Sequence, residues 1–173
     1  MRLGRDDATL WTKIIPTSYV RAWKVMQDLL RKRPQGILMF GFSRNATGLR
    51  LARYARNEDR AKARDNDGRT GRARIVNAAP NALSATARVD ELHRQLLAAN
   101  VPASVSEDAG GFVCNHVYFR TLEALARESA PNARCLFVHV GDWQGTADQD
   151  DVIRGAKLLV RAIAGADEGE DAA

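Results

Sequence analysis

Two uninterrupted apolar runs, Gly36–Phe42 (GILMFGF) and Cys135–Val140 (CLFVHV), constrain the fold of this chain more than any other feature. Runs without polar alternation are typical of strands that are buried on both faces of a sheet. Around these runs, apolar residues recur at helical spacing in residues 19–33, 86–99, 114–129 and 148–164. The pattern predicts an α/β fold, a three-layer αβα sandwich with a mostly parallel twisted sheet flanked by helices.

The other segments predict one domain followed by a tail. Residues 44–74 are polar and rich in arginine, which indicates a long excursion of turns and short strands. A short strand is expected at residues 103–105. Since 173 residues suit one domain with one core, we expect residues 1–165 to form it. The acidic residues 166–173 are expected to be a disordered tail.

Composition excludes several classes of protein. No stretch approaches the roughly 18 apolar residues that span a bilayer, and no apolar run follows Arg2 and Arg5 as a signal peptide requires. We therefore expect no membrane partner. Only two cysteines occur, Cys114 and Cys135, without clustered histidines, so the sequence has no pattern for a disulfide framework or a zinc site. We expect a cytoplasmic protein without metal or cofactor.

The net charge of +5 raises the question of a nucleic-acid partner. The arginines are spread along the chain, and their densest group, residues 44–74, has little aromatic interleaving beyond Tyr54. A solvated basic face is the simpler interpretation. We expect no nucleic acid among the partners, and a nucleic-acid-associated protein is the least supported hypothesis.

Cys114 is the candidate nucleophile. Gly110 and Gly111 precede it, a predicted helix follows it, and a helix N-terminus favours a thiolate because its unpaired N–H groups carry partial positive charge. His139 ends the second apolar run, at the edge of the sheet where active sites of open α/β folds lie. The two residues are a plausible nucleophile and base, although a lone cysteine or histidine is more often structural.

Several motifs resemble those of one known family in their order along the chain. Residues 101–106 (VPASVS) and 109–115 (AGGFVCN) look like the nucleophile signature of pyroglutamyl peptidase I, the pyrrolidone-carboxylate peptidases. Residues 136–140 (LFVHV) match that family's histidine strand. Weaker similarities occur at residues 14–19 (IIPTSY), 53–57 (RYARN) and 65–68 (DNDG). The resemblance covers about residues 12–163.

The resemblance implies a cysteine peptidase that removes N-terminal pyroglutamate from peptides. By that resemblance, Cys114 attacks the pyroglutamyl carbonyl, and His139 takes the thiol proton and later protonates the leaving amine. Phe112 and Val113 are expected beside the lactam ring. The family forms oligomers, so a homo-oligomer is possible.

Three departures from the family pattern affect this expectation. Ala52 occupies the position of the family's third catalytic residue, a glutamate that orients the imidazole. The family's leading strand and its aromatic loop have no counterpart. Residues 41–46 (GFSRNA) replace a glycine-rich stretch, and Gly141 replaces a proline. Glu58 and Asp59 are close in sequence to position 52, but the sequence places neither at His139.

These departures leave two main hypotheses. The first is an active pyroglutamyl-peptidase-like hydrolase that uses a Cys–His pair. The alternative is a catalytically impaired family member that binds peptide ends or acts as an interaction protein. Outside the motif, the simpler interpretation is structural: surface or helix packing for His93 and His116, and an inert core thiol for Cys135.

Overall fold

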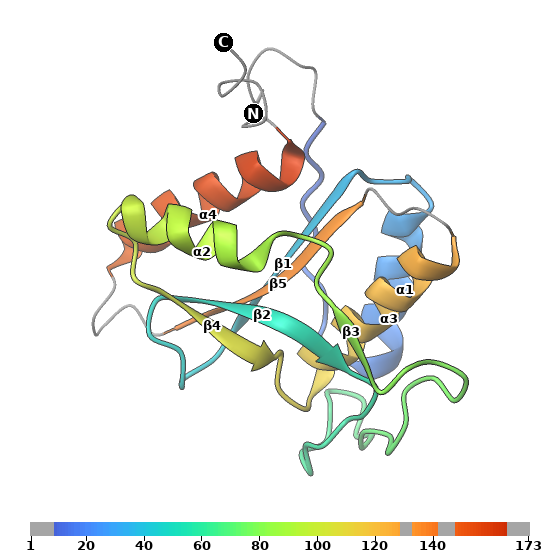
Figure 1. Cartoon of the computed structure of the whole chain (residues 1–173). Coiled ribbons are helices and arrows are strands. Elements are labelled where there is room, and N and C mark those ends of the chain that lie inside the picture. Colours follow the sequence, from blue (N-terminus) through green and yellow to red (C-terminus); the bar gives the residue numbers. More distant parts are fainter. Residues whose placement is uncertain (1–8, 129–132, 142–147, 166–173) are drawn as a thin grey trace.

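The computed structural model describes residues 9–128, 133–141 and 148–165 and alternates helices with strands. In chain order the elements are α1 (Tyr19–Leu30), β1 (Gly36–Phe42), β2 (Leu49–Arg56), β3 (Ala82–Ser84), α2 (Val89–Ala98), β4 (Ala103–Asp108), α3 (Val113–Arg127), β5 (Arg134–Val140) and α4 (Gln149–Ala164) (Figure 1). All four predicted helices and both apolar strands are confirmed, within a few residues at their ends. The predicted acidic tail, residues 166–173, lies outside the described residues.

The five strands form one sheet in the order β1-β5-β2-β3, with β4 also paired to β2. Pairs β1–β5 and β2–β4 are parallel, whereas β2 runs antiparallel to both β5 and β3. The sheet is therefore mixed, with two parallel and two antiparallel pairings among the described strands. Residues 43–48 join β1 to β2 without a crossover helix, so the chain turns back and β2 runs opposite to β1.

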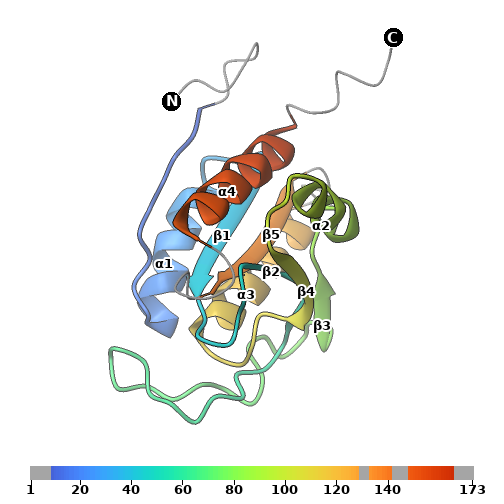
Figure 2. The same cartoon turned by 90° about the vertical axis from the view of Figure 1, so that its left-hand side faces the viewer.

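Helices cover both faces of the sheet, which confirms the layered α/β class (Figures 1 and 2). Helices α1 and α3 pack on one face around Met39, Cys135 and Phe137. Helices α2 and α4 pack on the other around Leu51, Leu136 and Val138. Neighbouring residues of β5 alternate between the two cores, as the two-residue period of a strand requires.

Local sequence signals explain where the helices begin and end. Ser18 caps α1, its hydroxyl accepting a hydrogen bond from the backbone N–H of Arg21 at 3.1 Å. Asp148 caps α4 in the same way, and Gly165 ends that helix with a left-handed backbone. Gly155 lets α4 approach the sheet closely, because a Cβ there would lie 2.5 Å from Leu49 Cδ1.

Strand β1 lies at one edge of the sheet, and in the described part of the chain its outer edge has no strand partner. Phe40 and Phe42 on this strand are exposed, the latter by 61%. None of the helices described here is both long and apolar enough to cross a bilayer.

Candidate active site

Cys114 lies in the first turn of α3, where the chain leaves a glycine turn. Gly110 has φ +82°, a left-handed conformation that favours glycine, and its N–H donates to the Asp108 carboxylate at 2.9 Å. Gly111 packs against the loop after β2, since a Cβ there would lie 2.8 Å from Arg60 Cβ and 3.0 Å from Arg60 N. The turn thus holds the thiol at the helix N-terminus, as the sequence predicted.

Gly41 lies next to the Cys114 thiol and is also the strand partner of His139. A Cβ built on Gly41 would lie 3.1 Å from Cys114 Sγ. In the parallel pair β1–β5, Gly41 is the register partner of His139, so their Cβ directions point to the same face of the sheet. The structure therefore places the Cys114 thiol over the face of the sheet to which the His139 side chain points, beside the strand partner of His139.

His139 is buried, with 6% of its surface exposed. Its ring lies against the Phe137 ring, with centroids 5.0 Å apart. Burial, and then the positive charge of Arg50, lower the pKa of His139 to about 4, against a smaller opposing effect of Asp108. At neutral pH the imidazole is therefore uncharged and able to accept a proton.

The direction of the Cys114 pKa differs from the sequence-based expectation. Burial raises the pKa of this thiol, and the opposing contribution of its own backbone N–H is smaller. The expectation that the helix N-terminus favours a thiolate is therefore wrong for this geometry, because loss of solvent outweighs the helix end. Both shifts favour the uncharged forms, the thiol of Cys114 and the neutral imidazole of His139.

Arg50, not position 52, stands directly opposite His139. In the antiparallel pair β2–β5, Arg50 is the register partner of His139 and Ala52 that of Phe137. The Arg50 guanidinium donates to the Ser43 hydroxyl at 3.1 Å and to the Asn45 carbonyl at 3.2 Å. Among the described residues, His139 Nδ1 has no hydrogen-bond partner. No described carboxylate therefore orients the imidazole.

The two acidic residues near position 52 have other partners. Asp59 accepts a hydrogen bond from His116 Nδ1 at 3.0 Å, and both side chains are buried. Glu58 lies 3.5 Å from Arg60. Neither Glu58 nor Asp59 therefore contacts His139 in place of a carboxylate at position 52. His116 is thus a buried partner of Asp59, which is more specific than the surface or packing role expected from sequence.

Comparison with known proteins identifies the family. The sequence profile described as pyroglutamyl peptidase matches residues 3–152, most of the chain. The chain belongs to the pyroglutamyl peptidase family.

Relatives and solved structures agree with this membership. Pyrrolidone-carboxylate peptidase 1 of Ralstonia nicotianae is 35% identical over 168 residues, covering 91% of this chain and 78% of that protein. The pyrrolidone-carboxylate peptidase of Cupriavidus taiwanensis is 35% identical over 136 residues, covering 78% of this chain and 63% of that protein. The pyrrolidone carboxyl peptidase of Thermococcus litoralis superimposes with a TM-score of 0.84 at 25% identity, over 95% of this chain and 82% of that one.

Loop 43–48 and Gly141, where the sequence analysis expects departures from the family pattern, contact each other. Gly141 donates its backbone N–H to the Gly48 carbonyl at 2.9 Å. A Cβ at Gly141 would lie 1.9 Å from the Ala46 carbonyl oxygen. Because loop 43–48 approaches this closely, no larger residue fits at position 141 without moving the loop. The altered loop and the glycine in place of proline are therefore mutually compatible.

The residues expected at the lactam ring differ in burial. Phe112 is partly buried and packs edge-on against the Tyr19 ring, with centroids 5.7 Å apart. Val113 is buried in the core between the sheet and helices α1 and α3. Their contact with a pyroglutamyl ring stays a prediction.

Sequence reasoning missed two asparagines that hold the site together. The buried Asn115 amide accepts from Arg56 N–H at 2.8 Å and donates to the carbonyls of Arg56 and Glu58, at 2.9 Å each. These bonds fix the start of α3 to the end of β2. The Asn57 side-chain amide likewise donates hydrogen bonds to backbone carbonyls and accepts them from backbone N–H groups of residues 75–80. Their presence within the family motifs was the available signal, but their contacts depend on tertiary structure.

No group of three or more His, Cys, Asp or Glu side chains with metal-binding geometry occurs among residues 9–128, 133–141 and 148–165. The arrangement of Cys114 and His139 suits acyl transfer by a nucleophile and a general base.

Proposed function

We propose that this chain is a cysteine exopeptidase that removes an N-terminal pyroglutamyl residue from peptides, with Cys114 as nucleophile and His139 as general base. The observation that carries the proposal is the packing of Cys114 Sγ beside Gly41, the strand partner of His139. Family membership supports the substrate class.

The reaction follows from the two side chains. His139 accepts the thiol proton as Cys114 Sγ attacks the pyroglutamyl carbonyl carbon, and the backbone N–H groups at the start of α3 can stabilise the resulting oxyanion. Imidazolium then protonates the leaving amine as the C–N bond breaks, which leaves a thioester. Water, deprotonated by His139, hydrolyses the thioester and regenerates the thiol. Because both groups rest uncharged, proton transfer accompanies attack in the first step.

The substrate contacts and setting are part of the proposal. Phe112 and Val113 precede the nucleophile and would contact the lactam ring. Cytoplasmic peptides with an N-terminal pyroglutamate are the expected substrates, and a homo-oligomer is compatible with the family.

The first test uses a fluorogenic pyroglutamyl amide and the two cysteines of the chain. Purified protein should release the fluorescent amine, and Cys114→Ala should abolish release. Cys135→Ala is the matched control, because that thiol is fully buried in β5 and burial raises its pKa. It should retain release. No release above the Cys114→Ala background, or equal loss in both variants, would contradict a peptidase that uses Cys114.

A second candidate function, binding of pyroglutamyl peptide ends without turnover, rests on a different observation. Among the described residues, His139 Nδ1 has no acceptor, and Arg50 rather than a carboxylate faces the ring. Calorimetric titration of a pyroglutamyl dipeptide, with the same dipeptide bearing N-terminal glutamine as comparison, tests it. Selective binding together with absent turnover would favour this candidate, and measurable turnover would exclude it.

A further inference from the structure

A basic groove lies between α1, α3 and the loop after β2, away from the candidate active site. It has a volume of about 480 Å³, and its charged lining consists of Lys24, Asp28, Arg31, Arg72, Arg120 and His116. A smaller adjoining hollow of about 350 Å³ shares Tyr19, Arg72 and His116. Cys114 and His139 line neither one. Residues 114 and 116 point to nearly opposite sides of α3, because each residue turns a helix by about 100°.

Positive charge in this groove is largely uncompensated. Of the lining cations, Arg31 is paired with Asp28. In the described part of the chain, Lys24, Arg72 and Arg120 make no ion pair with a carboxylate, and Glu123, the acidic residue near Arg120, is paired with Arg127. Lys24 and Arg72 are exposed, whereas Arg120 is partly buried and its Nε has no hydrogen-bond partner among the described residues. An unpaired cation that is partly removed from solvent favours an anionic ligand over water alone.

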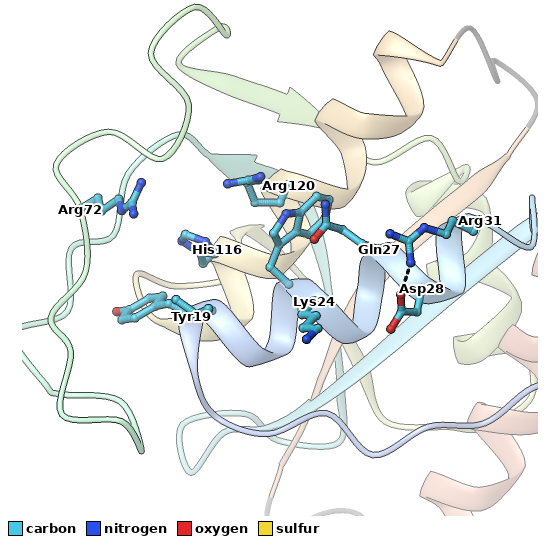
Figure 3. Close-up of a pocket in the computed structure, with 10 residues that line it drawn as sticks. Tyr19, Lys24, Gln27, Asp28, Arg31, Arg72, His116 and Arg120 are labelled. Atoms are coloured by element: carbon cyan, nitrogen blue, oxygen red, sulfur yellow. Dashed lines mark hydrogen bonds and ion pairs between the residues drawn. The ribbon is translucent and has the colours of Figure 1, made fainter.

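The side chains converge on one region. The Arg72 and Arg120 guanidinium groups point toward each other, with His116 below them (Figure 3). The Arg120 guanidinium lies over the Trp23 ring, 4.4 Å from its centroid. This stacking fixes the direction of the guanidinium.

Asp59 fixes the orientation of the His116 ring. Its carboxylate accepts from His116 Nδ1 at 3.0 Å and from the Arg72 backbone N–H at 3.0 Å. Because Nδ1–H of His116 donates to Asp59, Nε2 is the ring nitrogen that remains for a ligand, and in this tautomer it accepts a hydrogen bond. One buried carboxylate thus positions both the histidine and the segment that carries Arg72.

Tyr19 adds a polar group without a partner. The side chain is buried, lines both hollows and packs against the His116 ring, with centroids 5.1 Å apart. Its hydroxyl has no hydrogen-bond partner among the described residues. The hydroxyl oxygen is itself buried, so a ligand in the groove would contact the Tyr19 ring and not this oxygen.

We propose that Arg72, Arg120 and His116 form a binding site for a tetrahedral oxyanion, the phosphate of a small phosphomonoester or inorganic phosphate. Arg72 and Arg120 donate to such a ligand from different sides, and His116 Nε2 can accept from its P–OH group, whereas a planar carboxylate is usually bound by one arginine in bidentate fashion. The site is separate from the pair Cys114–His139, and its occupancy does not depend on peptidase activity.

The test is calorimetric titration of the Cys114→Ala protein with inorganic phosphate, phenyl phosphate and acetate at constant ionic strength. Saturable binding of a phosphate is expected. The double variant Arg72→Gln/Arg120→Gln should weaken binding by about tenfold or more, the factor that follows from loss of charge-assisted hydrogen bonds. Arg94→Gln/Arg161→Gln is the matched control, since it removes the same charge from exposed positions on α2 and α4.

Tyr19→Phe removes only a hydroxyl that is buried beneath the groove, so it should leave phosphate binding nearly unchanged and serves as a second control. Tighter binding of phenyl phosphate would assign the ligand to a phosphomonoester, and equal binding would assign it to inorganic phosphate. Absence of saturable phosphate binding, equal loss in both double variants, or acetate binding as tightly as phosphate would overturn the proposal.

Discussion

At the scale of single residues, the charge beside His139 is the main difference from a histidine held by a carboxylate. Burial and Arg50 act in the same direction on its pKa, which lies near 4. A neutral base at physiological pH is useful for general base catalysis, but a base of such low pKa accepts a proton less readily. In the proposed reaction, Arg50 would therefore make His139 a weaker base.

Arg50→Gln should therefore shift the acidic limb of the pH profile of kcat/KM. His139 must be neutral to act as base, so activity falls as pH drops through its pKa. Removing the cation raises that pKa, and the limb should move upward by roughly one pH unit, since burial, the larger cause, remains.

Arg50→Lys is the control, because it keeps the charge and removes the fork that bonds Ser43 and Asn45. If the acidic limb of the pH profile does not move in Arg50→Gln, or moves equally in Arg50→Lys, the charge of Arg50 does not cause the lowered pKa of His139.

At the scale of elements, the register of β2 against β5 decides what position 52 can do. Ala52 is fully buried opposite Phe137, on the same face as His139 and one diagonal step from it. Diagonal neighbours in a sheet are within reach of a long side chain. A glutamate at this position could therefore reach the imidazole, although it must displace apolar packing around Phe137.

Ala52→Glu should increase kcat/KM for the fluorogenic amide by roughly 10²-fold, because a carboxylate would orient the imidazole and stabilise its charged form. The same variant should have a lower melting temperature, since it buries a carboxylate. Ala52→Gln has the same shape without the charge and should give no comparable increase. Equal rates for both variants would indicate that side-chain size, and not a carboxylate, changes the site.

At the scale of the whole molecule, folding and protonation are linked through His139. The pKa of His139 is about 4 when folded, below its ordinary value of 6.5, so between these values the unfolded chain binds more protons. The pKa values of Asp65 and Asp67 are also lowered in the folded chain, so at lower pH the unfolded chain again binds more protons. Burial raises the pKa of Asp65, but three backbone N–H groups outweigh it and lower the pKa. Hydrogen bonds from Ser18 and Arg21 lower the pKa of Asp67.

The free energy of unfolding should therefore fall as pH drops from 6.5 to 4, by at most about 1.4 kcal/mol per pH unit from His139. The aspartates should add a further loss below their ordinary value of 3.8. Urea unfolding at a series of pH values measures the first slope. His139→Gln should flatten it, while His93→Gln should leave it in place. A slope that persists in His139→Gln would assign it to other groups.

Much of the fold was predictable because apolar periodicity is a local property of the sequence. The strands at residues 36–42 and 134–140 and the stripes of the four helices all appear where the pattern predicts them. Strand β3 was not predicted, because Ala82–Ser84 is too short to carry a periodic signal. The direction of β2 was also missed, since strand direction depends on which strands pair and not on any single segment.

The sequence by itself determined the layered α/β class, the family motifs, and the candidates Cys114 and His139. Only the tertiary structure placed Arg50 opposite His139, paired Asp59 with His116, and faced Arg72 toward Arg120. The physical reason is that the pKa of a buried group depends on desolvation and on neighbouring charges from other strands and helices. The same holds for Cys114: the motif identifies it as the candidate nucleophile, while burial decides that its pKa is raised.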